Sequence, residues 1–215
     1  DLRFALLALV TIFITSRISI RIPRLTSAIT VSDTFIFLIL LLYGGEAAVL
    51  VATTEALTSA SRISKKPRTL IFNAAVLACA TFLTGLVGQS LFQRAESQNF
   101  EAFSGNYLFV LCLMVLVQYV VNSGLAAIYE ALKSNQPLWQ TWRTHYLWTS
   151  ITYVAGASGA ALTAKFMSSV GLFTILITTP IIGIIYFTYR TYLKNIKAAE
   201  FQAEQARSPV EELNH

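Results

Sequence analysis

The sequence predicts an all-α fold, a polytopic transmembrane helical bundle whose last helix extends into the cytoplasm. Three observations support this prediction, and the first two concern composition. Of the 215 residues, 55% are hydrophobic and only 13% are charged, with a mean hydropathy of +0.60. A soluble domain of this length needs a more charged surface. The third observation is a set of apolar runs, of which the clearest, at 69–92 and 107–131, exceed the roughly 20 residues needed to cross a bilayer.

The apolar runs divide into about seven helical segments. The second and third segments are short, and Gly44-Gly45 separates them, so we expect this helix pair to be broken inside the membrane. Broken helices are tolerated at that depth only where they face protein or a water-filled cavity. The break is therefore the first place to expect a pocket. The segments are 2–18, 32–43, 46–60, 69–93, 106–132, 145–168 and 170–207.

The basic residues predict the orientation. With the C-terminus in the cytoplasm, the inner loops and the tail hold thirteen of the sixteen lysines and arginines. This asymmetry accounts for the net charge of +5 without a nucleic-acid partner. An odd number of segments leaves the N-terminus outside. Because the first residue is Asp1 rather than methionine, we expect a further helix upstream.

Three carboxylates lie near the break. Asp33 and Glu46 stand at helix starts, where they either cap the helix and interact with its dipole or take part in a site. Glu55 lies inside an apolar helix, where a charge is costly, so it is protonated, paired or facing water. Glu46 and Glu55 are nine residues apart and fall on opposite helix faces, which excludes a paired site between these two.

Polar side chains on later segments complete the candidate ligand-binding set. Asn73 could hydrogen-bond Glu55 across a helix pair. Gln118 and Asn122 are four residues apart and share a face, which either joins helices or lines a site. The candidate ligand-binding residues are Asp33, Glu46, Glu55, Asn73, Gln118 and Asn122.

Other residues of the spans have packing roles. Gly156, Ala160 and Ala164 have the four-residue spacing that lets helix backbones approach closely. Cys79 and Cys112 lie mid-span, and we expect both to be small buried hydrophobic residues. Aromatic residues before the sixth span, including Trp139 and Trp142, are typical of a membrane interface.

No catalytic arrangement is found. Two histidines cannot form a metal cluster, and the sequence has no P-loop, dinucleotide-binding or nucleophile motif. We therefore expect no catalytic residue, no metal and no cofactor in this chain, which by itself is not an enzyme.

The C-terminal segment has a weak heptad pattern. Tyr189 and Ile196 repeat every seven residues, as do Tyr192 and Ala199, which indicates either a coiled coil or an amphipathic helix on the inner leaflet. Pro180 should kink the span before it. We expect these five residues to transmit a signal, with a transmembrane domain over 1–190 and a signalling helix over 191–215 that supports a homodimer and leads to an output domain.

Several stretches resemble a known family: SDTFIFLILLLYGGEAAVL, the SKK loop, LIFN and PVEELNH. They are similar to the multipass N-terminal sensor regions of bacterial cyclic-di-GMP signalling proteins. The resemblance implies an inner-membrane input domain that responds to a small or lipophilic ligand. It also implies that the full protein is a diguanylate cyclase or a cyclic-di-GMP phosphodiesterase.

A more distant similarity is to the substrate-binding S-components of energy-coupling-factor transporters. It leaves a solute-binding subunit as the alternative function. This chain lacks the alanine-every-fourth-residue motif with which the first helix of S-components docks the transport module. A third possibility is a membrane anchor without a ligand, in which none of the candidate polar residues would matter.

Overall fold

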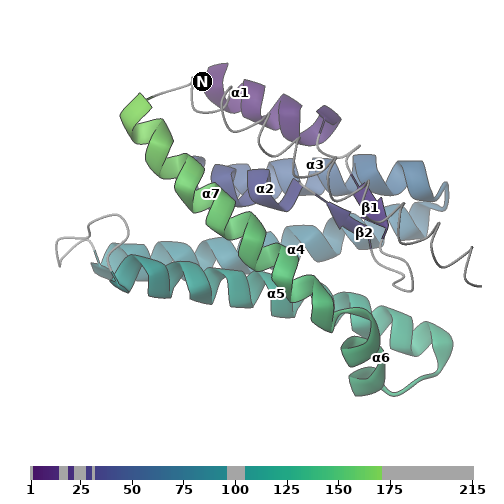
Figure 1. Cartoon of the computed structure of the whole chain (residues 1–215). Helices are drawn as coiled ribbons and strands as arrows, with labels where there is room; N and C mark the ends of the chain where they lie inside the picture. The colour runs from purple at the N-terminus through teal and green to yellow at the C-terminus, as the bar shows by residue number, and fades with distance from the viewer. Residues whose placement is uncertain (1, 15–18, 22–27, 31, 96–104, 171–215) are drawn as a thin grey trace, which may run out of the picture. The chain divides into compact units, whose positions relative to one another are not determined.

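The computed structural model describes residues 2–14, 19–21, 28–30, 32–95 and 105–170, which belong to one compact unit (Figure 1). The all-α prediction is confirmed for this part of the chain, where two three-residue strands are the extended elements described. The helices are α1 (Leu2–Leu9), continued by the π-helical η1 (Val10–Ile14), then α2 (Ser32–Tyr43), α3 (Gly45–Ile63), α4 (Pro67–Ala95), α5 (Gly105–Ser134), α6 (Leu138–His145), the 3-10 helix η4 (Leu147–Thr149) and α7 (Ser150–Val170).

Gly44 alone separates α2 from α3, which confirms the predicted break. Its φ of 87° and ψ of 177° lie in a region open essentially only to glycine. The single-residue connection turns the chain back, so α2 and α3 pack against each other. At 12 residues, α2 is about 18 Å long and is too short to cross a bilayer alone.

Helices α3, α4 and α5 run side by side, with α3 and α4 in the most extensive contact (Figure 1). Two glycines permit this closeness. A methyl group placed on Gly85 would lie only 3.0 Å from the Cα atom of Gly45. Between α4 and α5, a methyl group on Gly88 would lie 3.0 Å from the sulfur of Met114. Gly85 is therefore needed for the packing of α4 on α3, whereas Gly44 is needed for its backbone conformation.

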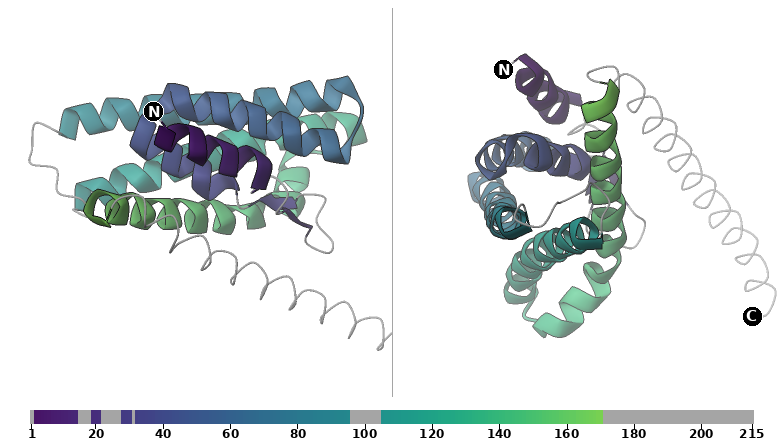
Figure 2. Two further views of the ribbon diagram at one scale, coloured as in Figure 1. Left: turned by 90° about the horizontal axis from the view of Figure 1, so that it is seen from above. Right: turned by 90° about the vertical axis from the view of Figure 1, so that its left-hand side faces the viewer.

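Helix α7 lies along one side of the group formed by α2 to α5 and contacts α2 and α5 (Figure 2). Its small residues make the approach close, as their spacing predicts. A methyl group on Gly156 would lie 3.3 Å from Thr34 Oγ1 and 3.4 Å from the Thr34 nitrogen. Ala160 is fully buried. The start of α2 is thus held between α3 and α7.

Two features differ from the sequence prediction. Residues 138–145 form helix α6 where we expected a loop before the sixth span. The strands β1 (Ser19–Arg21) and β2 (Ala28–Thr30) pair antiparallel, with Ser19 opposite Thr30. The predicted segment 170–207 and the boundary at residue 190 lie outside the described residues.

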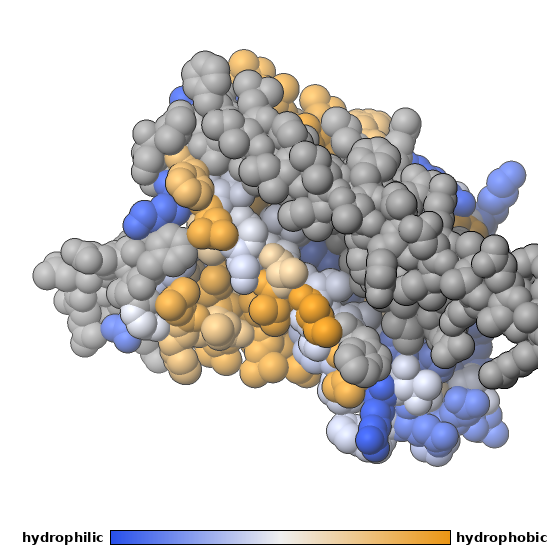
Figure 3. Space-filling view, viewed as in Figure 1, coloured by the Kyte–Doolittle hydropathy of each residue, from blue (hydrophilic) through white to orange (hydrophobic). Residues whose placement is uncertain are grey.

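Two helices are long and apolar enough to cross a membrane, α4 over Pro67–Phe92 and α5 over Gly105–Ser134. Apolar side chains gather on the face shown in Figure 3, over the middle of the unit, with hydrophilic residues beyond one end. Phe82, Phe109 and Leu116 are among the exposed apolar residues of α4 and α5. Cys79 and Cys112 are exposed on the same helices, so the prediction that they are buried is wrong.

Candidate functional site: a buried carboxylate pair

Asp33 and Glu55 meet inside the unit because of the turn at Gly44. Each lies eleven residues from Gly44, one on α2 and the other on α3. With a rise of about 1.5 Å per residue, antiparallel helices bring two such positions to the same level, about 16 Å from the turn. The two carboxylates are close enough to interact through their charges. Like charges are thus placed together in the apolar part of the chain.

Glu55 is buried, with 3% of its surface exposed, and its Oε1 accepts a hydrogen bond of 2.7 Å from Ser59 Oγ one turn further along α3. Ser32, the first residue of α2, places its hydroxyl near the same carboxylate but outside hydrogen-bond geometry. The Ser32 side chain is 1% exposed and its Oγ has no hydrogen-bond partner. The Glu55 carboxylate is the nearest acceptor for this hydroxyl, whose own oxygen stays free to accept a hydrogen bond from a ligand.

Asp33 connects the pair to α7. Its carboxyl group is packed closely by neighbouring atoms, although the residue as a whole is partly exposed. Its Cβ packs at Gly156, and its charge acts on the hydroxyl of Tyr153, one turn earlier on α7. That hydroxyl is hydrogen-bonded to Asn122 Nδ2 of α5. The carboxylate pair therefore lies where α2, α3, α5 and α7 converge.

The charge of the pair is only partly compensated. Among the residues that the structure describes, Lys133 forms an ion pair with Glu130 on the surface. Neither Asp33 nor Glu55 forms an ion pair within this part of the chain. Arg62 acts on Glu55 through its charge from a solvent-exposed position two turns along α3. Asp33 lies in the first turn of α2, where the helix dipole favours a negative charge. The helix dipole thus offsets part of the charge of Asp33, and Arg62 offsets part of the charge of Glu55.

An aromatic group links the site to α6. The ring of Tyr119 lies 6.0 Å from that of Tyr153 and 5.9 Å from that of Trp142, measured between centroids. Trp142 Nε1 donates a hydrogen bond of 3.0 Å to Ser123 Oγ of α5. Helix α6 is therefore hydrogen-bonded to α5 next to the Tyr153–Asn122 hydrogen bond. Trp142 thus has a packing role between α6 and α5.

The structure brings together three of the six candidate ligand-binding residues: Asp33, Glu55 and Asn122. Gln118 is buried between α4 and α5 instead. Its Nε2 donates to Thr81 Oγ1 at 3.3 Å, and its Oε1 lies 2.7 Å from the Thr84 hydroxyl. Gln118 therefore has the helix-joining role that was one of its two predicted alternatives.

Two candidates do not belong to the site. Asn73 is exposed, and its Nδ2 donates to the Thr69 carbonyl of its own helix at 2.9 Å. The predicted hydrogen bond to Glu55 is therefore wrong. Glu46 is exposed in the first turn of α3, next to the turn and far along the helix from Glu55. The candidate transmission residues Pro180, Tyr189, Tyr192, Ile196 and Ala199 lie outside the described residues.

Sequence reasoning missed Ser32 and Tyr153 as site residues and compared the wrong pair of carboxylates. The equal separation of Asp33 and Glu55 from Gly44 was the available signal, because a tight turn pairs positions equidistant from it. A weaker signal was available for Tyr153, which lies three residues before Gly156 on the small-residue face of its helix.

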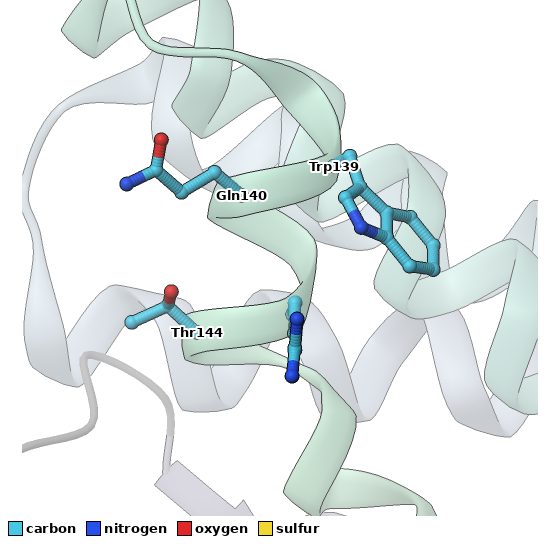
Figure 4. Close-up of a pocket in the computed structure, with 4 residues that line it drawn as sticks. Trp139, Gln140 and Thr144 are labelled. Carbon is cyan, nitrogen blue, oxygen red and sulfur yellow. The ribbon is translucent and has the colours of Figure 1, made fainter.

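A hollow lies at α6, open to solvent, with a volume of about 540 Å³. Trp139, Gln140, Arg143 and Thr144 line it, all on this one helix. Gln140 and Thr144 point to the same side of α6, whereas Trp139 points to the other (Figure 4). Groups that diverge in this way do not enclose a ligand, so the hollow is the weaker candidate.

The carboxylate pair can bind a proton or a cation. Within the part of the chain that the structure describes, no group of three or more histidine, cysteine, aspartate or glutamate side chains could hold a metal ion. Two carboxylates with hydroxyl and amide neighbours favour a ligand that donates hydrogen bonds. Comparison with protein-family models, curated proteins and solved structures finds no match to this chain.

Proposed function

We propose that this chain is the membrane-embedded sensory input domain of a bacterial signalling protein. Its last helix passes the signal to a cytoplasmic diguanylate cyclase or phosphodiesterase domain. The all-helical unit, two helices apolar enough to cross a membrane and the apolar surfaces of α4 and α5 support a multipass position in the inner membrane. The basic residues at the ends of α3 and α5 and at the start of α4 favour a cytoplasmic C-terminus.

One observation carries the proposal: the buried carboxylate pair contacts the helix that leads toward the C-terminus. Asp33 packs at Gly156 of α7 and acts on Tyr153 of the same helix. A change in the charge or occupancy of the pair therefore changes the contacts that hold α7. A free-energy difference of about 1–3 kcal/mol between two positions of α7 changes their ratio by about 5- to 150-fold. A homodimer formed through the C-terminal helix would carry this change to paired output domains.

The output of a fused enzyme tests the proposal. The chain is joined after His215 to a diguanylate cyclase domain, and cyclic di-GMP is measured in cells for the wild type, Glu55→Gln and Glu46→Gln. We expect Glu55→Gln to change the output at least about fivefold, since it removes a charge that acts on Asp33, which in turn contacts α7. Glu46→Gln makes the same chemical change at an exposed position and should match the wild type. Equal output from all three proteins would contradict the proposal.

A solute-binding subunit of a transporter is the second candidate. The observation that favours it is the same interior site, which is partly accessible at Asp33. Native mass spectrometry of the chain released from nanodiscs separates the two functions, with and without residues 198–215. A dimer that the truncation dissociates supports the sensor. A monomer in both forms that retains a small metabolite supports the transporter subunit.

A further inference from the structure

We infer that the Asp33–Glu55 site binds a primary ammonium group, which comes either from a small soluble amine or from an aminophospholipid headgroup. The inference rests on the proposed function, because it names the class of ligand that binds at the same site. Three groups that accept hydrogen bonds carry it: the two carboxylates and the hydroxyl of Ser32.

The site can relieve its buried charge by binding a proton or a cation. Two carboxylates lie together in the interior, and within the described residues neither has a lysine or arginine in an ion pair. The dipole of α2 favours the charge of Asp33, and the exposed Arg62 offsets only part of the charge of Glu55. Buried charges are stable when they are paired and hydrogen-bonded. A monovalent cation supplies this pairing without reversing the sign of the site.

The unpartnered hydroxyl of Ser32 favours an ammonium group over other cations. Ser32 is 1% exposed, its Oγ has no partner, and it faces the carboxylate of Glu55. An ammonium group has three N–H donors and no acceptor, so it can bond to both carboxylates and to this oxygen together. A metal ion finds fewer ligands here than it prefers, since no group of three metal-binding side chains is found among the described residues.

The surroundings also suit an organic cation. Tyr153 and Tyr119 lie beside the site with their rings 6.0 Å apart, and a cation is attracted to the faces of such rings. The accessible part of Asp33 gives a ligand a way to reach the pair. The group attached to nitrogen would lie against these aromatic rings and the small residues of α7.

Saturation-transfer NMR on the full chain in phosphatidylcholine nanodiscs tests the inference. Ethylammonium is the probe, and tetramethylammonium, which has the charge but no N–H donor, is its control. We expect saturable binding of ethylammonium that Asp33→Asn and Glu55→Gln each weaken by at least about tenfold, as expected for the loss of a charge-assisted hydrogen bond. Ser32→Ala should weaken it about threefold, and Glu46→Gln should leave it unchanged. Circular dichroism of each variant confirms its helical content.

Phosphatidylethanolamine added to the nanodiscs identifies the source of the ammonium group. Competition with ethylammonium assigns the site to a lipid headgroup, and its absence assigns it to a soluble amine. Equal binding of tetramethylammonium, equal loss in Glu46→Gln, or no binding at all would overturn the inference. The fused-cyclase assay is independent of this result: an output that responds to Glu55→Gln without ammonium binding leaves the sensor standing and removes the ligand class.

Discussion

Glu55 places a carboxylate beside that of Asp33 in the interior, with a single hydrogen bond of 2.7 Å from Ser59 recorded to its oxygens. Nearby like charges raise the free energy of the folded state because the interior screens them poorly. Evolution retains such costly arrangements mainly at sites of function. At the residue scale, the pair is therefore the feature of this chain that stability alone does not explain.

Removing one charge of the pair should stabilise the fold. In ligand-free protein, we expect Glu55→Gln to raise the free energy of unfolding by about 1–2 kcal/mol, since glutamine keeps the shape and the acceptor for Ser59 but ends the repulsion. Thermal unfolding followed by circular dichroism in detergent measures this. Glu46→Gln, on the exposed side of the same helix, is the matched control and should lower the free energy of unfolding by about 0.3–1 kcal/mol, since it removes a charge from the first turn of α3. A lower unfolding temperature for Glu55→Gln would show that its charge stabilises the fold.

At the element scale, three glycines decide how the helices meet. Gly44 supplies the conformation that folds α2 onto α3, Gly85 admits the backbone of Gly45, and Gly156 admits the start of α2. The level at which Asp33 and Glu55 meet depends on the first of these. The contact of the pair with α7 depends on the third.

Gly85→Ala should destabilise the unit, whereas Gly124→Ala should not. The added methyl group would lie 3.0 Å from the Gly45 Cα atom, a backbone atom that moves only with its helix, and overpacking of this kind costs about 1–3 kcal/mol. Nothing lies within 4 Å of a methyl group on Gly124, where alanine should add about 0.5–1 kcal/mol of stability. Thermal unfolding of the two single variants compares them. A similar shift in both would contradict close packing of α3 on α4.

Much of the element pattern could be predicted from the sequence, and the reasons for the failures are physical. The bounds of α2 were predicted at both ends, because Asp33 opens an apolar run that Gly44 closes. Helix α6 was missed because its eight residues, LWQTWRTH, are amphipathic and too short for a search based on apolar length.

The site could be predicted only in part. The burial of Glu55 followed from its apolar neighbours, but its partner depended on the three-dimensional turn at Gly44. Asn73 and Glu46 share the polar character of the true site residues, and only their helix faces distinguish them. A single sequence does not show how each helix is rotated about its own axis, so it does not distinguish these residues.

At the scale of the whole molecule, the proposed topology places the Gly44 turn toward the outer side of the membrane and the α3–α4 connection in the cytoplasm. Glu46 is exposed beside the Gly44 turn, and Lys65 is exposed in the α3–α4 connection. The two positions are about the length of α3 apart, and its 19 residues span roughly 28 Å, close to the thickness of the hydrocarbon core.

Cysteine labelling tests this topology. After both native cysteines are replaced by alanine, we expect Glu46→Cys to react with a charged thiol reagent in intact cells. Lys65→Cys should react only in inverted membrane vesicles. In the unsubstituted chain, Cys79 and Cys112 are exposed on α4 and α5. Because lipid would cover them, they should react with a membrane-permeant maleimide and resist the charged reagent. Labelling of Glu46→Cys and Lys65→Cys from the same side would refute the topology.

The central claim is that the carboxylate pair and α7 act as one coupled unit. A double-mutant cycle on the output of the cyclase fusion, with Glu55→Gln, Tyr153→Phe and both together, tests it most directly. Asp33 interacts with both residues, so we predict that their effects on cyclic-di-GMP production are non-additive, with a coupling of about 0.5–3 kcal/mol. Strictly additive effects would contradict the claim, because Glu55 and α7 would then act independently.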